Sequence, residues 1–95
     1  MNPERAALID YRLLAQLSAA GALIDEDALF DGVNVGLYPP AGRAEFDDRL
    51  CFVCAEKHWA VMVPHPTGLN IPSWRLTVEG ESQLAKLDSF YRKGR

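Results

Sequence analysis

The chain has 95 residues, of which 48% are hydrophobic and 24% charged, with 7 glycines and 6 prolines. This length suits one domain with a modest core, and the composition excludes collagen-like, low-complexity and wholly disordered chains. Ten basic residues against 13 acidic ones give a net charge of −3, so the average surface is not one that attracts phosphate.

The charge is divided unevenly along the chain. Residues 1–50 hold four basic and nine acidic residues, a net charge of −5, whereas residues 51–95 hold six basic and four acidic ones, a net charge of +2. A polyanion would therefore be directed to the C-terminal half. The sequence has neither an apolar stretch long enough for a bilayer nor a secretory signal, which predicts a cytoplasmic protein without membrane contact.

The first predicted element is an amphipathic helix from Glu4 to Ala20. Gly21 follows it, where glycine can end a helix in the left-handed conformation. A second, short helix is predicted from Glu26 to about Val33, with the side chain of Asp25 accepting hydrogen bonds from its free amides. The residues expected on the apolar faces of these two helices are Leu8, Tyr11, Leu14 and Leu17, with Leu13 beside them, and Ala28, Leu29 and Val33.

Prolines and glycines over residues 36–42 predict a loop. A third helix is predicted from about Ala41 to Lys57, and short runs of β-formers at Trp59–Val63 and Trp74–Leu76 predict a hairpin. Thr77 is placed to cap a last helix, which ends in a frayed basic segment over residues 92–95. The apolar faces of the third and last helices contain Phe46, Leu50, Val53, Cys54, Leu84, Leu87 and Tyr91.

The predicted order is helix, helix, helix, strand, strand, helix in a single domain over residues 1–95. This order predicts a mainly α fold with a small β-hairpin, an α+β class. The chain resembles the winged helix-turn-helix superfamily in Leu13–Gly21, in Leu50-x-x-Val53 and in Leu76–Leu84. The last of these is similar to the "L-T-x-x-G-x-x-x-L" segment with which many small bacterial and phage winged-helix regulators enter their last helix.

The resemblance implies a transcriptional regulator that binds double-stranded DNA, with the third helix in the major groove and the hairpin at neighbouring phosphates. The third helix carries two basic and four acidic residues off its apolar face, and these carboxylates would oppose DNA binding. Its charges could instead simply solvate an exposed helix face. The residues expected to contact DNA are Arg43, Arg49, Lys57, His65 and Arg75.

A second hypothesis is a winged-helix protein-protein interaction module without DNA binding, such as a phage-encoded inhibitor or assembly factor. The acidic third helix favours it, as do Leu69 and Ile71, two aliphatic residues expected at the hairpin tip, where they predict a protein contact. A homodimer through the outer helices, as in many small regulators, is compatible with both hypotheses.

Cys51 and Cys54 form a C-x-x-C pattern, and His58 follows four residues later, which is compatible with part of a zinc site. Core packing of the cysteines in a helix is the favoured interpretation. The sequence has no nucleophile elbow, glycine-rich phosphate loop or zinc-protease motif. We therefore expect a protein that is not an enzyme and needs neither a metal nor another cofactor.

Overall fold

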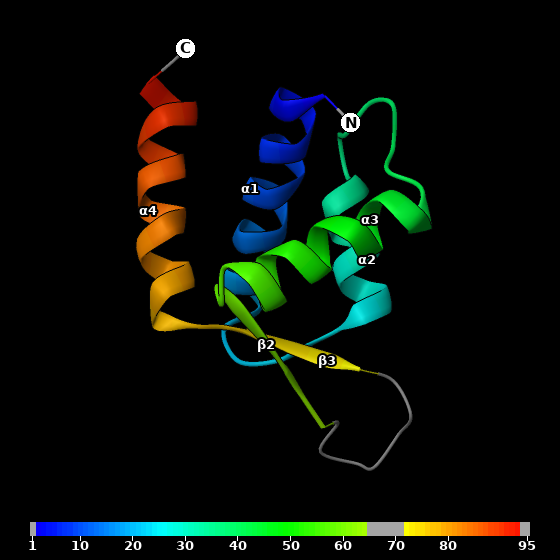
Figure 1. The fold of residues 1–95 in the computed structure, drawn as a ribbon, viewed down its shortest axis with the longest axis vertical. Coiled ribbons are helices and arrows are strands. Elements are labelled where there is room, and N and C mark those ends of the chain that lie inside the picture. The colour runs from blue at the N-terminus through cyan, green and yellow to red at the C-terminus, as the bar shows by residue number, and fades with distance from the viewer. Residues whose placement is uncertain (1, 65–71, 94–95) are drawn as a thin grey trace.

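The computed structural model describes residues 2–64 and 72–93, which form four α-helices, one π-helical turn and a small antiparallel sheet (Figure 1). The predicted α+β class is confirmed, with a sheet of three strands instead of two. No helix in these residues is long and apolar enough to cross a membrane. The elements are α1 (Pro3–Ala20), β1 (Ile24–Asp25), α2 (Glu26–Asn34), α3 (Arg43–Cys51), η1 (Phe52–Glu56), β2 (Ala60–Val63), β3 (Ser73–Leu76) and α4 (Val78–Lys93).

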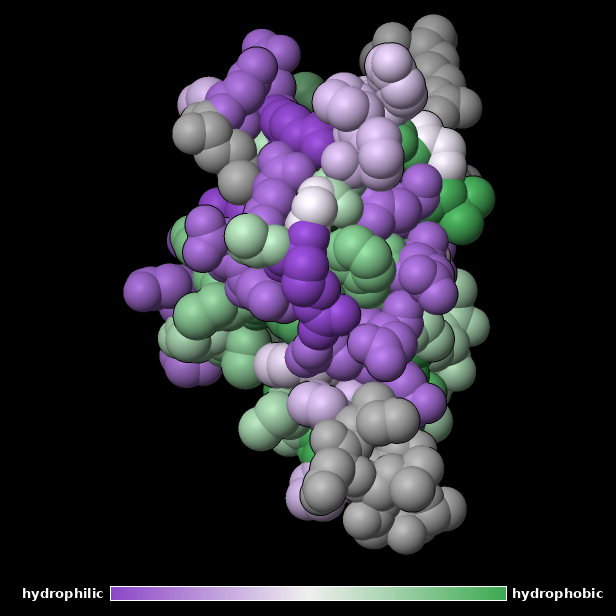
Figure 2. Space-filling model, turned by 90° about the vertical axis from the view of Figure 1, so that its right-hand side faces the viewer, coloured by the Kyte–Doolittle hydropathy of each residue, from purple (hydrophilic) through white to green (hydrophobic). Residues whose placement is uncertain are grey.

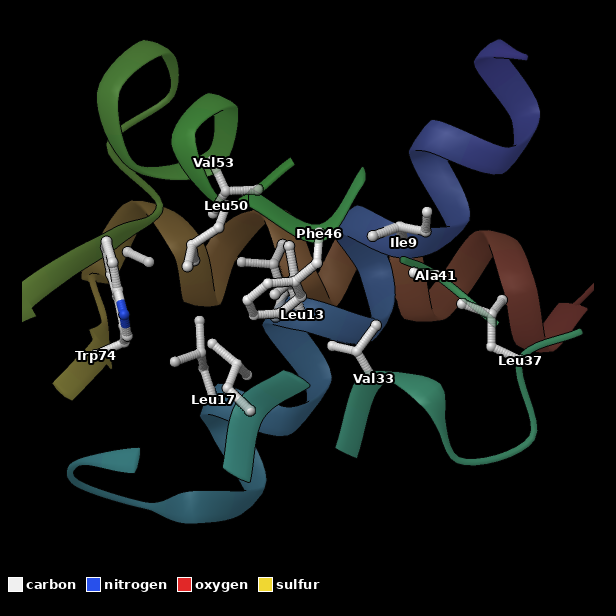
Figure 3. Close-up of a cluster of buried hydrophobic side chains, with 13 residues drawn as sticks. Ile9, Leu13, Leu17, Val33, Leu37, Ala41, Phe46, Leu50, Val53 and Trp74 are labelled. Atoms are coloured by element: carbon white, nitrogen blue, oxygen red, sulfur yellow. The ribbon is translucent and has the colours of Figure 1, made fainter. Parts of the chain in front are cut away.

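Helix α1 lies at the centre of the molecule, between α4 on one side and the α2 and α3 pair on the other (Figure 1). Its buried face packs with residues of α2, α3, η1 and the sheet in one apolar core (Figure 3). Three of the residues expected on the faces of α1 and α2 lie outside this core: Leu8 and Tyr11 are half-buried, and Ala28 is exposed. The core includes Ile9, Leu13, Leu14, Leu17, Leu29, Val33, Phe46, Leu50, Val53 and Trp74.

The sheet has the strand order β1-β3-β2, and both pairings are antiparallel. Strand β1 was not predicted, because two residues are too few to show a strand pattern. In it Asp25 pairs with Ser73, whose hydroxyl donates to the Asp25 carboxylate at 3.4 Å. The Asp25 side chain makes no capping hydrogen bond to α2, so that part of the prediction was wrong.

The third predicted helix is interrupted. Helix α3 begins at Arg43, two residues later than the predicted start at Ala41, and it becomes a π-helical turn from Phe52 to Glu56. Within that turn the amide of Lys57 donates to the Phe52 carbonyl at 3.1 Å. Cys54, expected on the apolar face, is half-buried against the core.

The junction between the sheet and α4 is tightly built. The hydroxyl of Thr77 accepts from the Gly80 amide at 3.0 Å, which confirms the predicted cap, and donates to the His58 carbonyl at 2.6 Å. The Thr77 amide donates to the Trp59 carbonyl at 3.0 Å. A Cβ at position 80 would lie 2.1 Å from that carbonyl oxygen, so the first turn of α4 requires glycine there.

Arg5 of α1 is joined to α3 by an ion pair and to the loop between α2 and α3 by a hydrogen bond. Arg5 donates to both carboxylate oxygens of Glu45, at 2.8 and 3.0 Å, and to the Pro39 carbonyl at 2.8 Å. The hydrogen bond from Arg5 is the main cause that lowers the pKa of Glu45 below its ordinary value of 4.5. The ionised form of Glu45 is therefore favoured in the folded chain.

We expect the replacement Glu45→Gln to flatten the acid limb of the stability profile. Because the folded-state pKa of Glu45 is lowered, its contribution is complete above the unfolded-state pKa and disappears as the pH falls through the folded value. Urea unfolding followed at several acidic pH values measures this. Equal slopes for the two proteins over the acid limb would contradict it.

Candidate functional site

Arg43, the first predicted DNA contact, is surrounded by carboxylates. It pairs with Glu26, with Asp27 at 3.3 Å and with Asp47 at 3.1 Å. Its guanidinium also lies 5.2 Å from the centre of the Phe46 ring. Burial opposes the charge, but the negative charges of Asp47 and Glu26 raise the pKa of Arg43. Arg43 therefore joins the start of α2 to the start of α3, with its charge already balanced.

Arg49, the second predicted DNA contact on this helix, points toward α1. Its guanidinium donates to both carboxylate oxygens of Asp10, at 2.8 and 2.6 Å, and lies 4.2 Å from the centre of the Phe52 ring. The hydrogen bonds that Arg49 donates to Asp10 are the main cause that raises the pKa of Arg49. The pair lines a shallow hollow of about 500 Å³ between α1, η1 and α4. Because its guanidinium is held by Asp10, Arg49 does not extend from the surface.

Among the remaining predicted DNA contacts, Lys57 lies against the same Phe52 ring as Arg49. Lys57 is exposed and lies 5.6 Å from the centre of the Phe52 ring. Arg75 is exposed on β3, opposite Val61 of β2, and has no ion pair with any described residue. His65 lies outside the described residues.

The exposed face of α3 and its surroundings are acidic. Asp47 and Asp48 lie on the exposed side of α3, Glu56 ends η1, and 78% of the Asp27 side chain is exposed at the start of α2. Figure 2 shows mainly hydrophilic side chains on the side of the molecule that carries α2 and α3. Carboxylates at this face would repel phosphate instead of releasing counterions from it.

The three residues considered for zinc do not form a ligand set. Cys51 is exposed and Cys54 is half-buried, and both are free thiols. His58 has a φ of 57° and lies where the chain leaves η1. Across residues 2–64 and 72–93, no group of three or more His, Cys, Asp or Glu side chains could hold a metal ion.

The surface also exposes large apolar side chains. Leu69 and Ile71, which were expected to contact a protein, lie outside the described residues. Where the structure does describe the chain, the most exposed of these side chains is Tyr38, at 91%, in the loop between α2 and α3. The others are Val35, Met62, Val78 and Phe90.

No family model matches the chain, and no curated protein or solved structure matches it. Support for its function therefore comes from the arrangement of its own residues.

Sequence reasoning did not identify Tyr38 or Arg12 as surface features. For Tyr38 the signal in the sequence is the pattern Leu37-Tyr38-Pro39, which lies in a predicted loop. An aromatic residue in such a loop belongs to no helix or strand face that would bury it, and the structure exposes Tyr38 while it buries Leu37. Arg12 carried no signal, since its position within α1 gives no indication of whether a carboxylate lies opposite.

Proposed function

We propose that the chain is a winged-helix module that acts by binding another protein and does not read DNA with its third helix. The observation that carries this proposal is that both arginines of α3, Arg43 and Arg49, are engaged in ion pairs within the fold. The winged-helix part is supported by the order of α1, α2 and α3, followed by the β2–β3 pair and α4.

The ion pairs argue against DNA contact for an energetic reason. Arg49 would have to leave Asp10, whose exposed fraction is 6%, before it could contact a phosphate. A buried carboxylate without its partner is strongly unfavourable. Arg43 could contact a phosphate only while the carboxylates of Glu26, Asp27 and Asp47 stood beside it, and these would repel that phosphate.

The exposed apolar side chains support the protein-binding half of the proposal. Tyr38 is 91% exposed and Phe90 is 71% exposed, although aromatic rings of this size are the side chains that most often fill a pocket in a protein partner. Neither ring offers the charge that a phosphate backbone requires. Phe90 belongs to α4 and Tyr38 to the loop between α2 and α3, and these two segments flank α1 from opposite sides (Figure 1).

We expect the chain to bind a fluorescently labelled random DNA duplex more weakly than about 100 µM even at low salt, where non-specific DNA binding is strongest. Fluorescence anisotropy at low and moderate salt measures this. Binding at low salt that weakens as salt is added, and that is lost in Lys57→Gln/Arg75→Gln, would overturn the proposal in favour of DNA binding through the hairpin.

The matched control is the double variant Asp47→Lys/Asp48→Lys, which reverses two exposed charges on α3. We expect it to gain salt-dependent DNA binding, because the face then presents cations to phosphate. This gain would demonstrate that the assay detects DNA binding by this scaffold and that charge, not shape, prevents it in the natural chain.

A further inference from the structure

The loop between α2 and α3 is held firmly at its base. The side chain of Asn34 accepts from the Ala41 amide at 2.7 Å and donates to the Ala41 carbonyl at 3.2 Å, so it closes the loop as a strand partner would. Leu37 and Ala41 are buried in the core, with exposed fractions of 6% and 4%. The loop is therefore anchored by its own residues at two points.

The apex of the same loop is held from α1. Arg5 reaches the Pro39 carbonyl while it pairs with Glu45, so the segment next to Tyr38 is joined to two helices. The entropy of ordering this backbone is thus already lost in the free chain. A rigid loop of this kind binds a partner without a further ordering cost.

Two side chains on this ordered loop remain in solvent. Tyr38 is 91% exposed and Val35 is 70% exposed, although Leu37 between them is buried. An aromatic ring held in place by a rigid backbone contributes a large contact area with little loss of side-chain freedom. These residues have the properties of an interface anchor and make no contribution to the core.

Arg12 adds a cationic group beside Gly36, the residue that follows Val35. Its Nε donates to the Val33 carbonyl at 2.7 Å, and its Nη2 lies 3.8 Å from the position that a Cβ on Gly36 would occupy. The other arginines of α1 and α3 each pair with a carboxylate, whereas no carboxylate among the described residues pairs with Arg12. Arg12 is half-buried, and no buried side-chain nitrogen among the described residues lacks a partner, so its Nη groups are not fully enclosed.

We propose that Val35, Tyr38 and Arg12 form a docking surface for a segment of a partner protein that carries a large apolar side chain beside a carboxylate. The apolar side chain packs on Tyr38 and Val35, and the carboxylate accepts hydrogen bonds from the Arg12 guanidinium. This inference rests on the proposed protein-binding function. It adds the location of the contact and the chemistry of the partner.

The test is selection of a random linear peptide library, displayed on phage, against the immobilised full chain. We expect the enriched peptides to share an aspartate or glutamate close to a large apolar residue. Synthetic copies should bind Tyr38→Ala and Arg12→Gln at least about tenfold more weakly than the natural chain, the loss typical of a central interface residue. Arg12→Lys, which keeps the charge but not the planar fork, should show a smaller loss.

The matched control is Phe90→Ser, which removes another exposed aromatic ring, 71% exposed, from α4. We expect it to bind the peptides as the natural chain does. Circular dichroism of each variant establishes that it is folded, and Tyr38→Ala removes no core contact.

Three results would overturn the docking surface. These are the absence of enriched acidic-apolar peptides, equal binding by Tyr38→Ala and the natural chain, and a concentration-dependent dimer that Tyr38→Ala abolishes, which would make a second copy the occupant. Peptides that bind elsewhere would overturn this surface alone. DNA binding in the duplex titration would instead overturn the proposed function itself.

Discussion

Replacing Asp10 by asparagine is expected to lower the free energy of unfolding by about 3 kcal/mol, because it leaves the Arg49 guanidinium partly buried without its counter-charge. Only 8% of the Asp10 side chain and 18% of the Arg49 side chain are exposed, so solvent cannot replace the lost partner fully. Urea unfolding followed by far-ultraviolet circular dichroism measures the change. A loss below about 1 kcal/mol, the range of surface ion pairs, would contradict it.

Two further variants separate the charge effect from simple loss of contact. Asp47→Asn removes a carboxylate that is 55% exposed, so we expect a change within about 0.5 kcal/mol. The double variant Asp10→Leu/Arg49→Met replaces both charges by apolar groups and should recover much of the stability lost in Asp10→Asn, since no uncompensated charge remains.

Replacing Gly80 by alanine is expected to destabilise the fold by about 2 kcal/mol, within the range measured when a core is overpacked. Helix propensity alone would give the opposite sign, because alanine is the better helix former by about 1 kcal/mol. The added Cβ would lie 2.1 Å from the Trp59 carbonyl oxygen and 2.7 Å from Cδ1 of Leu76, so the first turn of α4 must move away from the sheet. Thermal unfolding of the two proteins gives the difference.

Gly32 provides the matched control, because it is also a helical glycine with a crowded Cβ position. The atoms nearest to that position belong to the end of the Gln16 side chain, with Oε1 at 2.4 Å, and this side chain can rotate away. We therefore expect Gly32→Ala to be neutral, or stabilising by up to about 1 kcal/mol. If both alanines had the same effect, the explanation by backbone contact would be wrong.

Much of the fold could be predicted from local patterns. The helical spacing of Phe46, Leu50 and Val53 placed the correct residues in the core, and Thr77 was correctly identified as a cap. Strand β1 could not be predicted, since it exists only because the β3 backbone lies beside it. In α1 the predicted Leu13, Leu14 and Leu17 lie in the core. Ile9 joins them although its spacing did not place it there, whereas Tyr11 stacks on Tyr91 of α4.

The candidate site was less predictable, because charge type alone does not reveal charge pairing. Asp47 is four residues from Arg43, so that pair was visible in the sequence. Asp10 and Arg49 are 39 residues apart, and only the packing of α1 against α3 brings them together. Nor did the sequence indicate that Arg12, on the same helix as Asp10, pairs with no carboxylate among residues 2–64 and 72–93.

The π-helical turn makes the number of residues in this segment matter as well as the identity of its buried ones. Ala55 is exposed and contacts little, so most substitutions there should be accepted. Deleting one residue from Phe52–Glu56 would instead restore ordinary helical spacing and rotate the following chain by about 100° around the helix axis. Trp59, whose amide donates to the Val53 carbonyl at 2.9 Å, would then face away from the first turn of α4. Homologous chains would therefore show substitutions at the position of Ala55 but no gaps in this segment.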